Sequence, residues 1–243
     1  MEQQFSSLDR VMKPETISKN GASLKSHMSR KKLINVLAGI LILAVFSACD
    51  GGGGSSAKIK MTTEKAKLWF LLSGSGTATV DWGDGSEKVT LTIQESSNPI
   101  SGIRFEHDYN SATIRTISIN GDNITGLLCQ NYQLTSLDVS KNTALTGLNV
   151  AQNQLTSLDV SKNPKLTILE CFNNQLTNLD VSKNTLLKIL YCNYNQLISL
   201  DVSKNTELTE LLVDGNKLTS LDVSKNSALT RLNYDNDRVK LIK

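Results

Sequence analysis

Three cysteines recur at one position of a periodic sequence and are the first candidates for chemistry. Cys129, Cys171 and Cys192 are separated by multiples of 21 residues. Other copies of this position hold Val150, Val213 and Tyr234. We expect each thiol to fill a buried, valine-like slot. The alternative is a disulfide between Cys171 and Cys192, since adjacent copies would lie close together in an oxidising compartment. The sequence offers no C-x-x-C pair and no nearby histidine, so a zinc site is not expected.

Charged residues recur with the same period. Aspartates stand at one position and lysines three residues later: Asp138, Asp159, Asp180, Asp201 and Asp222, with Lys141, Lys162, Lys183, Lys204 and Lys225. We expect a solvated structural ladder in which each pair contributes little to stability. Calcium along the aspartate column is the alternative, but the Gly-Asp density of calcium-binding nonapeptide repeats is missing. We predict no metal and no cofactor.

The side chains needed for catalysis do not form a recognisable motif. The only histidines are His27 and His107, and a lone histidine at the entry to a strand is more often structural than catalytic. Asp81 and Asp84 flank Trp82, but carboxylates at that spacing are ordinary turn chemistry in a hairpin. No G-x-x-x-x-G-K motif is present to hold a phosphate. We therefore predict that the protein is not an enzyme.

These residues belong to a sequence motif of about nine residues, or adjoin it, and this motif occurs five times. It reads L-T-S-L-D-V-S-K-N and begins, with small changes, at Leu134, Leu155, Leu176, Leu197 and Leu218. Between these copies runs L-x-x-L-x-V-x-x-N-x-L, beginning at Leu145, Leu166, Leu187 and Leu208, after an imperfect copy at Ile124. A fixed period of this length indicates stacked units. One unit cannot bury its own apolar face, but a stack buries a continuous column of leucines.

The second pattern resembles the leucine-rich repeat family over residues 124–237. Leu148-Asn149-Val150 has the alternation of a strand, and strands of neighbouring coils would pair in parallel about 4.8 Å apart. Leu137-Asp138-Val139 fits either a second strand on the opposite face or a turn. The resemblance implies that the asparagine column beginning at Asn153 holds the turn backbone inside each coil. It also implies adhesion or recognition.

The predicted fold is mostly all-β, a leucine-rich repeat solenoid with a small N-terminal β-sandwich as its cap. Residues 122–243 form the solenoid, whose charged end, Arg238 to Lys243, would be the C-terminal cap. Residues 58–121 contain short apolar runs separated by turn residues. Within them, Trp82-Gly-Asp-Gly-Ser86 and His107-Asp-Tyr109 resemble motifs of PKD-type immunoglobulin-like domains. The last apolar run before the repeats, Ile114 to Ile119, should pair with or pack on the first coil.

The N-terminal residues predict export and anchoring. Residues 1–27 are interpreted as disordered, or as the product of a start codon assigned too far upstream. Residues 28–48 have a charged start, an apolar stretch and small residues before Cys49, as in a secretory signal peptide. With Cys49 in that place, the segment resembles a bacterial lipoprotein signal, which implies that Cys49 is acylated. A plain signal peptide or an uncleaved anchor are the alternatives. Residues 49–57 read as a Gly/Ser tether.

The charge balance gives no sign of nucleic-acid binding. Of 26 Lys and Arg and 23 Asp and Glu, seven and three precede Asp50, so 19 and 20 remain in the rest of the chain. These charges are mixed along the sequence, whereas a nucleic-acid footprint needs a clustered basic face. We therefore predict no nucleic-acid partner.

Three columns vary while the repeat framework stays constant, and they carry the binding hypothesis. In the middle copies they contain the predicted ligand-binding residues Ile168, Glu170, Phe172, Ile189, Tyr191, Asn193, Glu210, Leu212 and Asp214. The aromatic and aliphatic members would form an exposed patch edged by Glu210 and Asp214, and such patches usually bind a partner. Neutral variation on a solvent face is the alternative.

The functional hypothesis is a binding or adhesion module of the cell envelope, anchored to the membrane through Cys49 at the outer membrane or cell surface. The periplasmic face of the envelope is the alternative location. Its ligand would be a protein or a glycan recognised by the variable face. The alternatives are a structural spacer and an accessory protein of a carbohydrate-processing system, and all three rest partly on analogy of fold.

Overall fold

The computed structural model describes residues 58–243, so the predicted signal, the tether, Cys49 and residues 1–27 lie outside the described residues. The described part contains thirteen strands and no helix, and hence no helix that could cross a membrane. The strands are β1 (Ile59–Thr63), β2 (Lys67–Asp81), β3 (Val89–Thr92), β4 (Ile103–Asp108), β5 (Arg115–Leu128), β6 (Ser136–Asp138), β7 (Gly147–Asn149), β8 (Ile168–Glu170), β9 (Ile189–Tyr191), β10 (Glu210–Leu212), β11 (Ser220–Asp222), β12 (Arg231–Asn233) and β13 (Lys240–Ile242).

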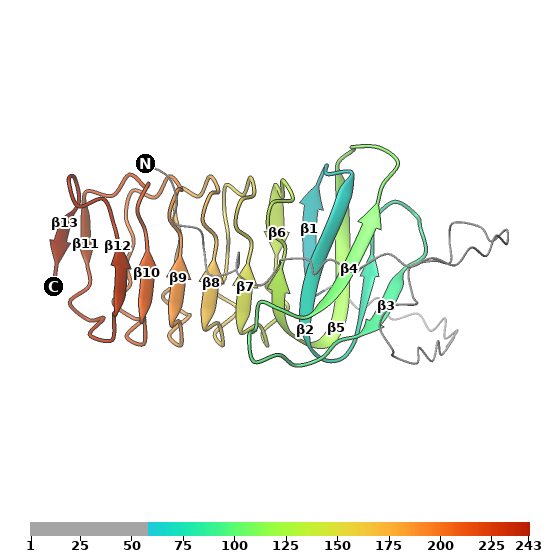
Figure 1. The fold of residues 1–243 in the computed structure, drawn as a ribbon, viewed down its shortest axis with the longest axis horizontal. Coiled ribbons are helices and arrows are strands. Elements are labelled where there is room, and N and C mark those ends of the chain that lie inside the picture. Colours follow the sequence, from blue (N-terminus) through green and yellow to red (C-terminus); the bar gives the residue numbers. More distant parts are fainter. Residues whose placement is uncertain (1–57) are drawn as a thin grey trace, which may run out of the picture. The chain divides into compact units, whose positions relative to one another are not determined.

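The repeats form a parallel β-solenoid, as predicted. Strands β7, β8, β9, β10 and β12 lie side by side in one sheet, and each pairs in parallel with the next (Figure 1). The register advances by one repeat at every step, so that Leu148 pairs with Leu169 and Leu169 with Leu190. These three leucines are completely buried. We call the outer side of this sheet the main face.

The sequence left open whether segments such as Leu137-Asp138-Val139, on the opposite side of the coil, are strands or turns. This side forms strands only at the two ends, where a neighbouring strand is available to pair. The first, β6, pairs antiparallel with β1, and the last, β11, pairs in parallel with β13. The intervening copies of Ser-Leu-Asp are not strands. The C-terminal strand β13 therefore extends this side by one strand, and Val239, which directly precedes it, is buried.

One strand joins the N-terminal layers to the repeats. The first half of β5 pairs antiparallel with β1, whereas Gly126 to Leu128 at its other end pairs in parallel with β7. The run from Ile114 to Ile119 was expected to pair with or pack on the first coil. In the structure, residues 115–119 and the strand of that coil belong to the same strand. The chain is therefore continuous in β conformation across residues 121 and 122.

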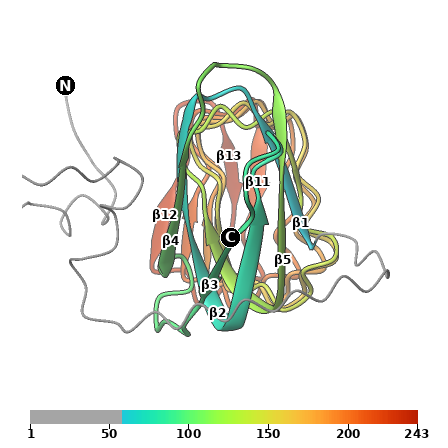
Figure 2. The same cartoon turned by 90° about the vertical axis from the view of Figure 1, so that its right-hand side faces the viewer.

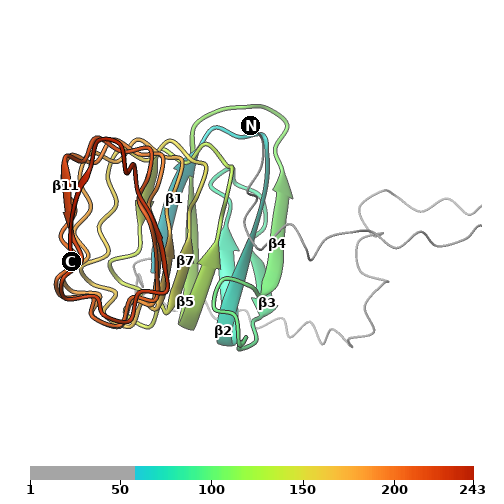
Figure 3. The same ribbon diagram turned by 60° about the vertical axis from the view of Figure 1, so that its left-hand side comes forward.

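A second long strand, β2, runs alongside β5 and folds the cap into two layers. Its first half pairs with β4 and its second half with β3, and its pairing with β5 is irregular near Gly74 and Ala78. The ring of Phe70, in the first half of β2, lies 5.6 Å from the ring of Trp82, which directly follows the end of β2. Because twelve positions of almost entirely extended chain separate these residues, this contact requires β2 to bend over. Figures 2 and 3 show these strands from two further directions.

The two motifs of the N-terminal cap meet in space. The ring of His107 stacks on Trp82 at 4.9 Å, and its Nε2 lies 2.8 Å from Oδ2 of Asp84. The Tyr109 hydroxyl donates a hydrogen bond of 2.9 Å to the Trp82 carbonyl. Hydrogen bonds from Ser86 and His107 hold the pKa of Asp84 well below its usual value. His107 therefore has a structural setting, in which it fastens one strand to the neighbouring turn.

Buried asparagines connect successive coils. Asn174 accepts a 3.0 Å hydrogen bond from the Leu155 amide of the preceding coil and donates one of 3.0 Å to the Val150 carbonyl. This column holds the turn backbone, as predicted. A second column was not predicted: Asn184 donates bonds of 3.0 and 2.9 Å to the carbonyls of Val160 and Asn163. Its members are Asn163, Asn184, Asn205 and Asn226, and all are buried.

We predict that Asn174→Ala lowers the free energy of unfolding by about 2–4 kcal/mol, because it leaves a buried amide and buried carbonyls without partners. Urea denaturation followed by circular dichroism measures this change. Asn178→Ala, at an exposed position four residues further along the chain, is the matched control and should change stability by less than about 0.5 kcal/mol. Equal effects of the two substitutions would contradict the role assigned to the asparagine column.

Candidate binding face

The cysteines are packing residues. Cys129, Cys171 and Cys192 are completely buried and their thiols are free, so the alternative of a Cys171–Cys192 disulfide is not realised in this structure. Burial raises the pKa of Cys129 and of Cys171 to about 12. Because the thiolate is the reactive form of cysteine, these side chains are inert. They occupy the valine-like slot that the sequence predicted.

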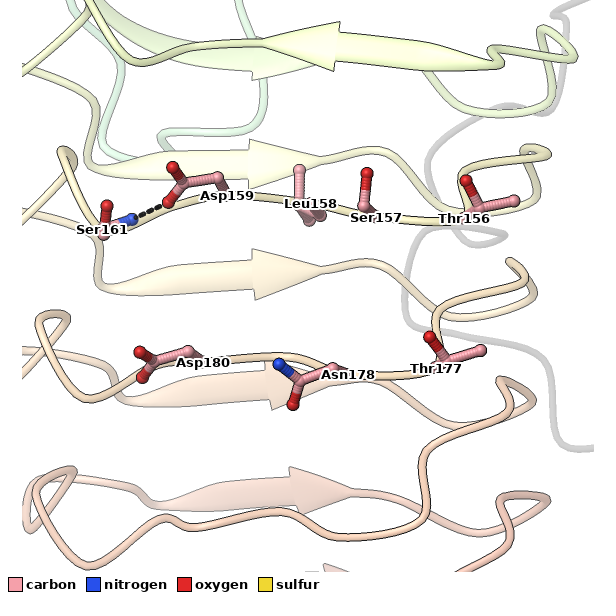
Figure 4. Close-up of a pocket in the computed structure, with 8 residues that line it drawn as sticks. All are labelled: Thr156, Ser157, Leu158, Asp159, Ser161, Thr177, Asn178 and Asp180. Atoms are coloured by element: carbon pink, nitrogen blue, oxygen red, sulfur yellow. Dashed lines mark hydrogen bonds between the residues drawn. The ribbon is translucent and has the colours of Figure 1, made fainter.

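The aspartates on the opposite face hold the turns that follow them. Oδ1 of Asp159 accepts a hydrogen bond of 2.8 Å from the Ser161 amide, and Asp180 accepts an equivalent bond from Ser182. These amides lower the pKa of both carboxyls. A shallow groove of about 280 Å³ lies along this face between Thr156 and Asp180 (Figure 4). Over residues 58–243, no three Asp, Glu, His or Cys side chains converge as a metal site would require.

The main face is closed over the first two coils. The loop between β3 and β4 covers it: a Cβ on Gly126 would lie 1.6 Å from the Pro99 carbonyl oxygen, and one on Gly147 would lie 2.7 Å from the Pro99 Cβ. Asn149 is completely buried. The sequence-based expectation that the three variable columns face solvent is therefore wrong for these coils. The glycines there reflect the space that the loop requires.

The main face is open from β8 onward, and the nine predicted binding residues lie there on three consecutive coils. Eight of them are half-buried: Ile168, Phe172, Ile189, Tyr191, Asn193, Glu210, Leu212 and Asp214. Glu170, which we expected to be outward and exposed, is only 7 % exposed. The structure thus brings the set together on β8, β9 and β10 and the residues that follow them. We call this region, extended by the coil of β12, the open face.

A polar network crosses the patch that the sequence predicted to be aromatic and apolar. The Tyr191 hydroxyl donates a hydrogen bond to Glu210 of the next coil. Nη1 of Arg231, one coil further, lies 3.2 Å from Oε2 of Glu210 and 3.3 Å from the Tyr191 hydroxyl. The Arg231 guanidinium lies over the Tyr191 ring at 5.8 Å from its centroid. The carboxylate of Glu210 is therefore paired within the chain.

Glu170 is the most unusual titratable group of the open face. Burial raises its pKa to about 7, and the charge of Glu210 adds to the shift, while a hydrogen bond from Asn149 opposes it. That bond joins Asn149 Nδ2 to Glu170 Oε2 at 2.6 Å. The ionised Glu170 carboxylate therefore has one hydrogen-bond donor, Asn149, and forms no ion pair among the described residues.

Sequence reasoning missed the turn that borders the open face. One position per coil has a positive φ angle, and the series is Asn131, Gln152, Asn173, Tyr194 and Gly215. Tyr194 is 54 % exposed, and its ring lies against Gly215, where a Cβ would come within 2.6 Å of the ring. A bulky side chain rarely takes this conformation. Only Asn131, Asn173 and Gly215 in this series are residue types that favour a positive φ angle, and they are the signal for the turn in the sequence.

Comparison with known proteins agrees with this architecture. The family model described as At1g61320/AtMIF1, LRR domain, matches residues 91–234, which is more than half of the chain. The chain therefore belongs to the leucine-rich repeat family. No curated protein matches it.

Several solved structures share part of the chain. The functional domain of InlJ from Listeria monocytogenes, described as including a cysteine ladder, is 42 % identical, with a TM-score of 0.45, over 51 % of this chain. This chain spans only 28 % of that domain. The ectodomain of the receptor kinase SOBIR1 from Arabidopsis thaliana is 19 % identical over 51 % of this chain and 78 % of its own, with a TM-score of 0.43. The BIR2 ectodomain from Arabidopsis thaliana is 18 % identical over 46 % and 70 %, with a TM-score of 0.38.

We predict that Glu170→Gln stabilises the protein in a pH-dependent way. The folded pKa of about 7 lies above the ordinary value of 4.5, so the folded state binds more protons than the unfolded state between these values and loses stability as pH rises through them. The variant should match the parent below pH 4.5 and exceed its free energy of unfolding by roughly 2–3 kcal/mol above pH 7.

Urea denaturation between pH 4 and 8.5 measures this difference. Glu207→Gln, at an exposed position, is the control for removing one carboxylate, and its effect should stay within about 0.5 kcal/mol at every pH. A difference between Glu170→Gln and the parent that does not change with pH would contradict the proposed cause of the shift.

Proposed function

We propose that the protein is a protein-binding module of the cell envelope that recognises its partner through the open face. Membership of the leucine-rich repeat family supports a binding scaffold rather than a catalyst. The observation that carries the proposal is the cluster of varied, accessible aliphatic and aromatic side chains on the open face. The framework repeats almost unchanged, the loop of Pro99 covers the first two coils, and varied aliphatic and aromatic side chains stay accessible on β8 to β10. Half-exposed rings such as Phe172 and Tyr191 are typical anchors of interfaces.

We predict that Phe172→Asp combined with Tyr191→Asp abolishes capture of the partner, because charged groups would replace the apolar anchors. The partner is sought by pull-down from envelope and host-cell extracts, and a glycan array run in parallel tests the other ligand class. Binding should weaken at least about 100-fold, which corresponds to the loss of two interface anchors. Circular dichroism must show that the variant remains folded.

The matched control introduces two aspartates elsewhere, at the exposed Leu186 and Ile198, and should bind as the parent does. Tyr191→Phe removes only the hydroxyl and separates loss of the ring from loss of its bond to Glu210. A partner that binds the double variant as tightly as the parent would refute the open face as the recognition surface. Capture by glycans alone would replace a protein partner with a carbohydrate.

The anchor is a second part of the proposal and rests on sequence. A charged start, an apolar stretch and the small residues before Cys49 support acylation of that cysteine, followed by a Gly/Ser tether. We further propose that residues 58–121 are a PKD-like domain that acts as spacer and cap. The contacts of Trp82 and Asp84 with His107 and Tyr109 support this reading, since they join the two motifs that carry the resemblance.

We predict that Cys49→Ser abolishes incorporation of labelled fatty acid and moves the protein from the detergent-rich to the aqueous phase in Triton X-114 partitioning. The physical reason is that acyl chains supply the membrane affinity of an otherwise polar protein. Protease treatment of intact cells then separates display on the cell surface from a periplasmic location. Fatty-acid labelling that persists in the variant would contradict acylation at this residue.

A further inference from the structure

We propose that the partner presents basic side chains, lysine or arginine, to two carboxylates of the open face, Glu170 and Asp214. The inference rests on the proposed function and specifies the chemistry of the surface that the open face would bind. The partner is thus a protein with a segment that carries at least two positive charges. This complementarity follows from two carboxylates that the fold leaves without a counter-ion.

The open face carries four carboxylates and only two of them are paired. Glu210 pairs with Arg231 at 3.2 Å, and Asp235 pairs with Arg238 at 2.7 Å. Over residues 58–243, Glu170 and Asp214 form no ion pair. The face therefore has two carboxylates without a counter-ion, and burial raises the pKa of both, which favours their neutral forms in the free protein.

The two unpaired carboxylates are also poorly solvated. Glu170 is 7 % exposed and has Asn149 as its hydrogen-bond donor. The half-buried Asp214 carboxylate has a side-chain hydrogen bond from Tyr194, but its Oδ1 is shielded from solvent and has no hydrogen-bond partner among the described residues. Partly buried acceptors without donors are costly. A cation from a partner placed at these carboxylates would supply the missing counter-charge.

The chain itself shows how the open face accommodates a cation. Arg231 contacts the Glu210 carboxylate and lies over the Tyr191 ring, which combines charge pairing with a cation–π contact. Glu170 and Phe172, two coils earlier, offer the same pair of groups, a carboxylate and an aromatic ring. No arginine of this chain occupies them within the described residues.

The geometry of the sheet gives the spacing of the two sites. Glu170 lies on β8, and Asp214 follows β10, two strands away and two residues further along the strand direction. With strands about 4.8 Å apart and about 3.3 Å per residue, their backbones are about 12 Å apart. Two basic residues three or four positions apart in an extended segment span this distance.

Binding of an octa-arginine peptide to the full chain tests the inference, measured by fluorescence polarisation at 50 and 300 mM salt. The parent should bind, and Glu170→Gln with Asp214→Asn should weaken binding at least about 10-fold at low salt, with a smaller difference at high salt. Asp159→Asn with Asp180→Asn removes the same charge from the opposite face, where the amide can still accept the serine N–H, and should bind as the parent does. An octa-glutamate peptide should not bind.

Absence of octa-arginine binding by the parent, or equal losses in the two double variants, would overturn the inference. Its failure is distinguishable from failure of the proposed function. A captured partner that is lost by Phe172→Asp with Tyr191→Asp, but retained by Glu170→Gln with Asp214→Asn at low salt, refutes the basic partner and leaves the open face as the binding surface. A partner retained by both variants refutes both proposals.

Discussion

The structure depends on hydrogen bonds that run from each coil to the next. Short parallel strands of three residues would be unstable alone, and here each strand from β7 to β10 is held between two neighbours in a constant register. The buried asparagines extend this pairing beyond the strands, since Asn174 and Asn184 bond to backbone groups of the preceding coils. Leucine burial drives the stacking, but the backbone and amide bonds fix the register. That fixed register aligns side chains of different coils into columns.

The aligned columns explain how a repetitive sequence produces a specific surface. Positions inside the coil are copied because each must fill the same space and make the same bonds. Positions on the main face are free of that requirement except where another segment covers them, as Pro99 covers Gly126 and Gly147. Identity between copies therefore reports packing, and difference between copies reports either a covering segment or a surface for recognition. The structure is needed to separate the last two cases.

The repeat architecture was predictable because it follows from a period that any reader of the sequence can count. The inward leucines, the cysteine slots and the Asn153 column are local consequences of that period. The covering loop was not predictable, since its path over Gly147 depends on how the N-terminal layers are joined to the first coil. Nor was the network of Tyr191, Glu210 and Arg231, because its members come from three coils and meet only through the orientation of long side chains. The burial of Glu170 was missed for the same reason.

The continuity of β5 has a mechanical consequence. Because the strand that pairs with β1 and β2 is also the strand that begins the stack, no linker separates the cap from the coils. A load applied to the first layers reaches the repeats directly through covalent backbone and through neighbouring strands. The described residues should accordingly resist tension as one cooperative element and keep the orientation of the open face constant relative to the cap under a steady pull.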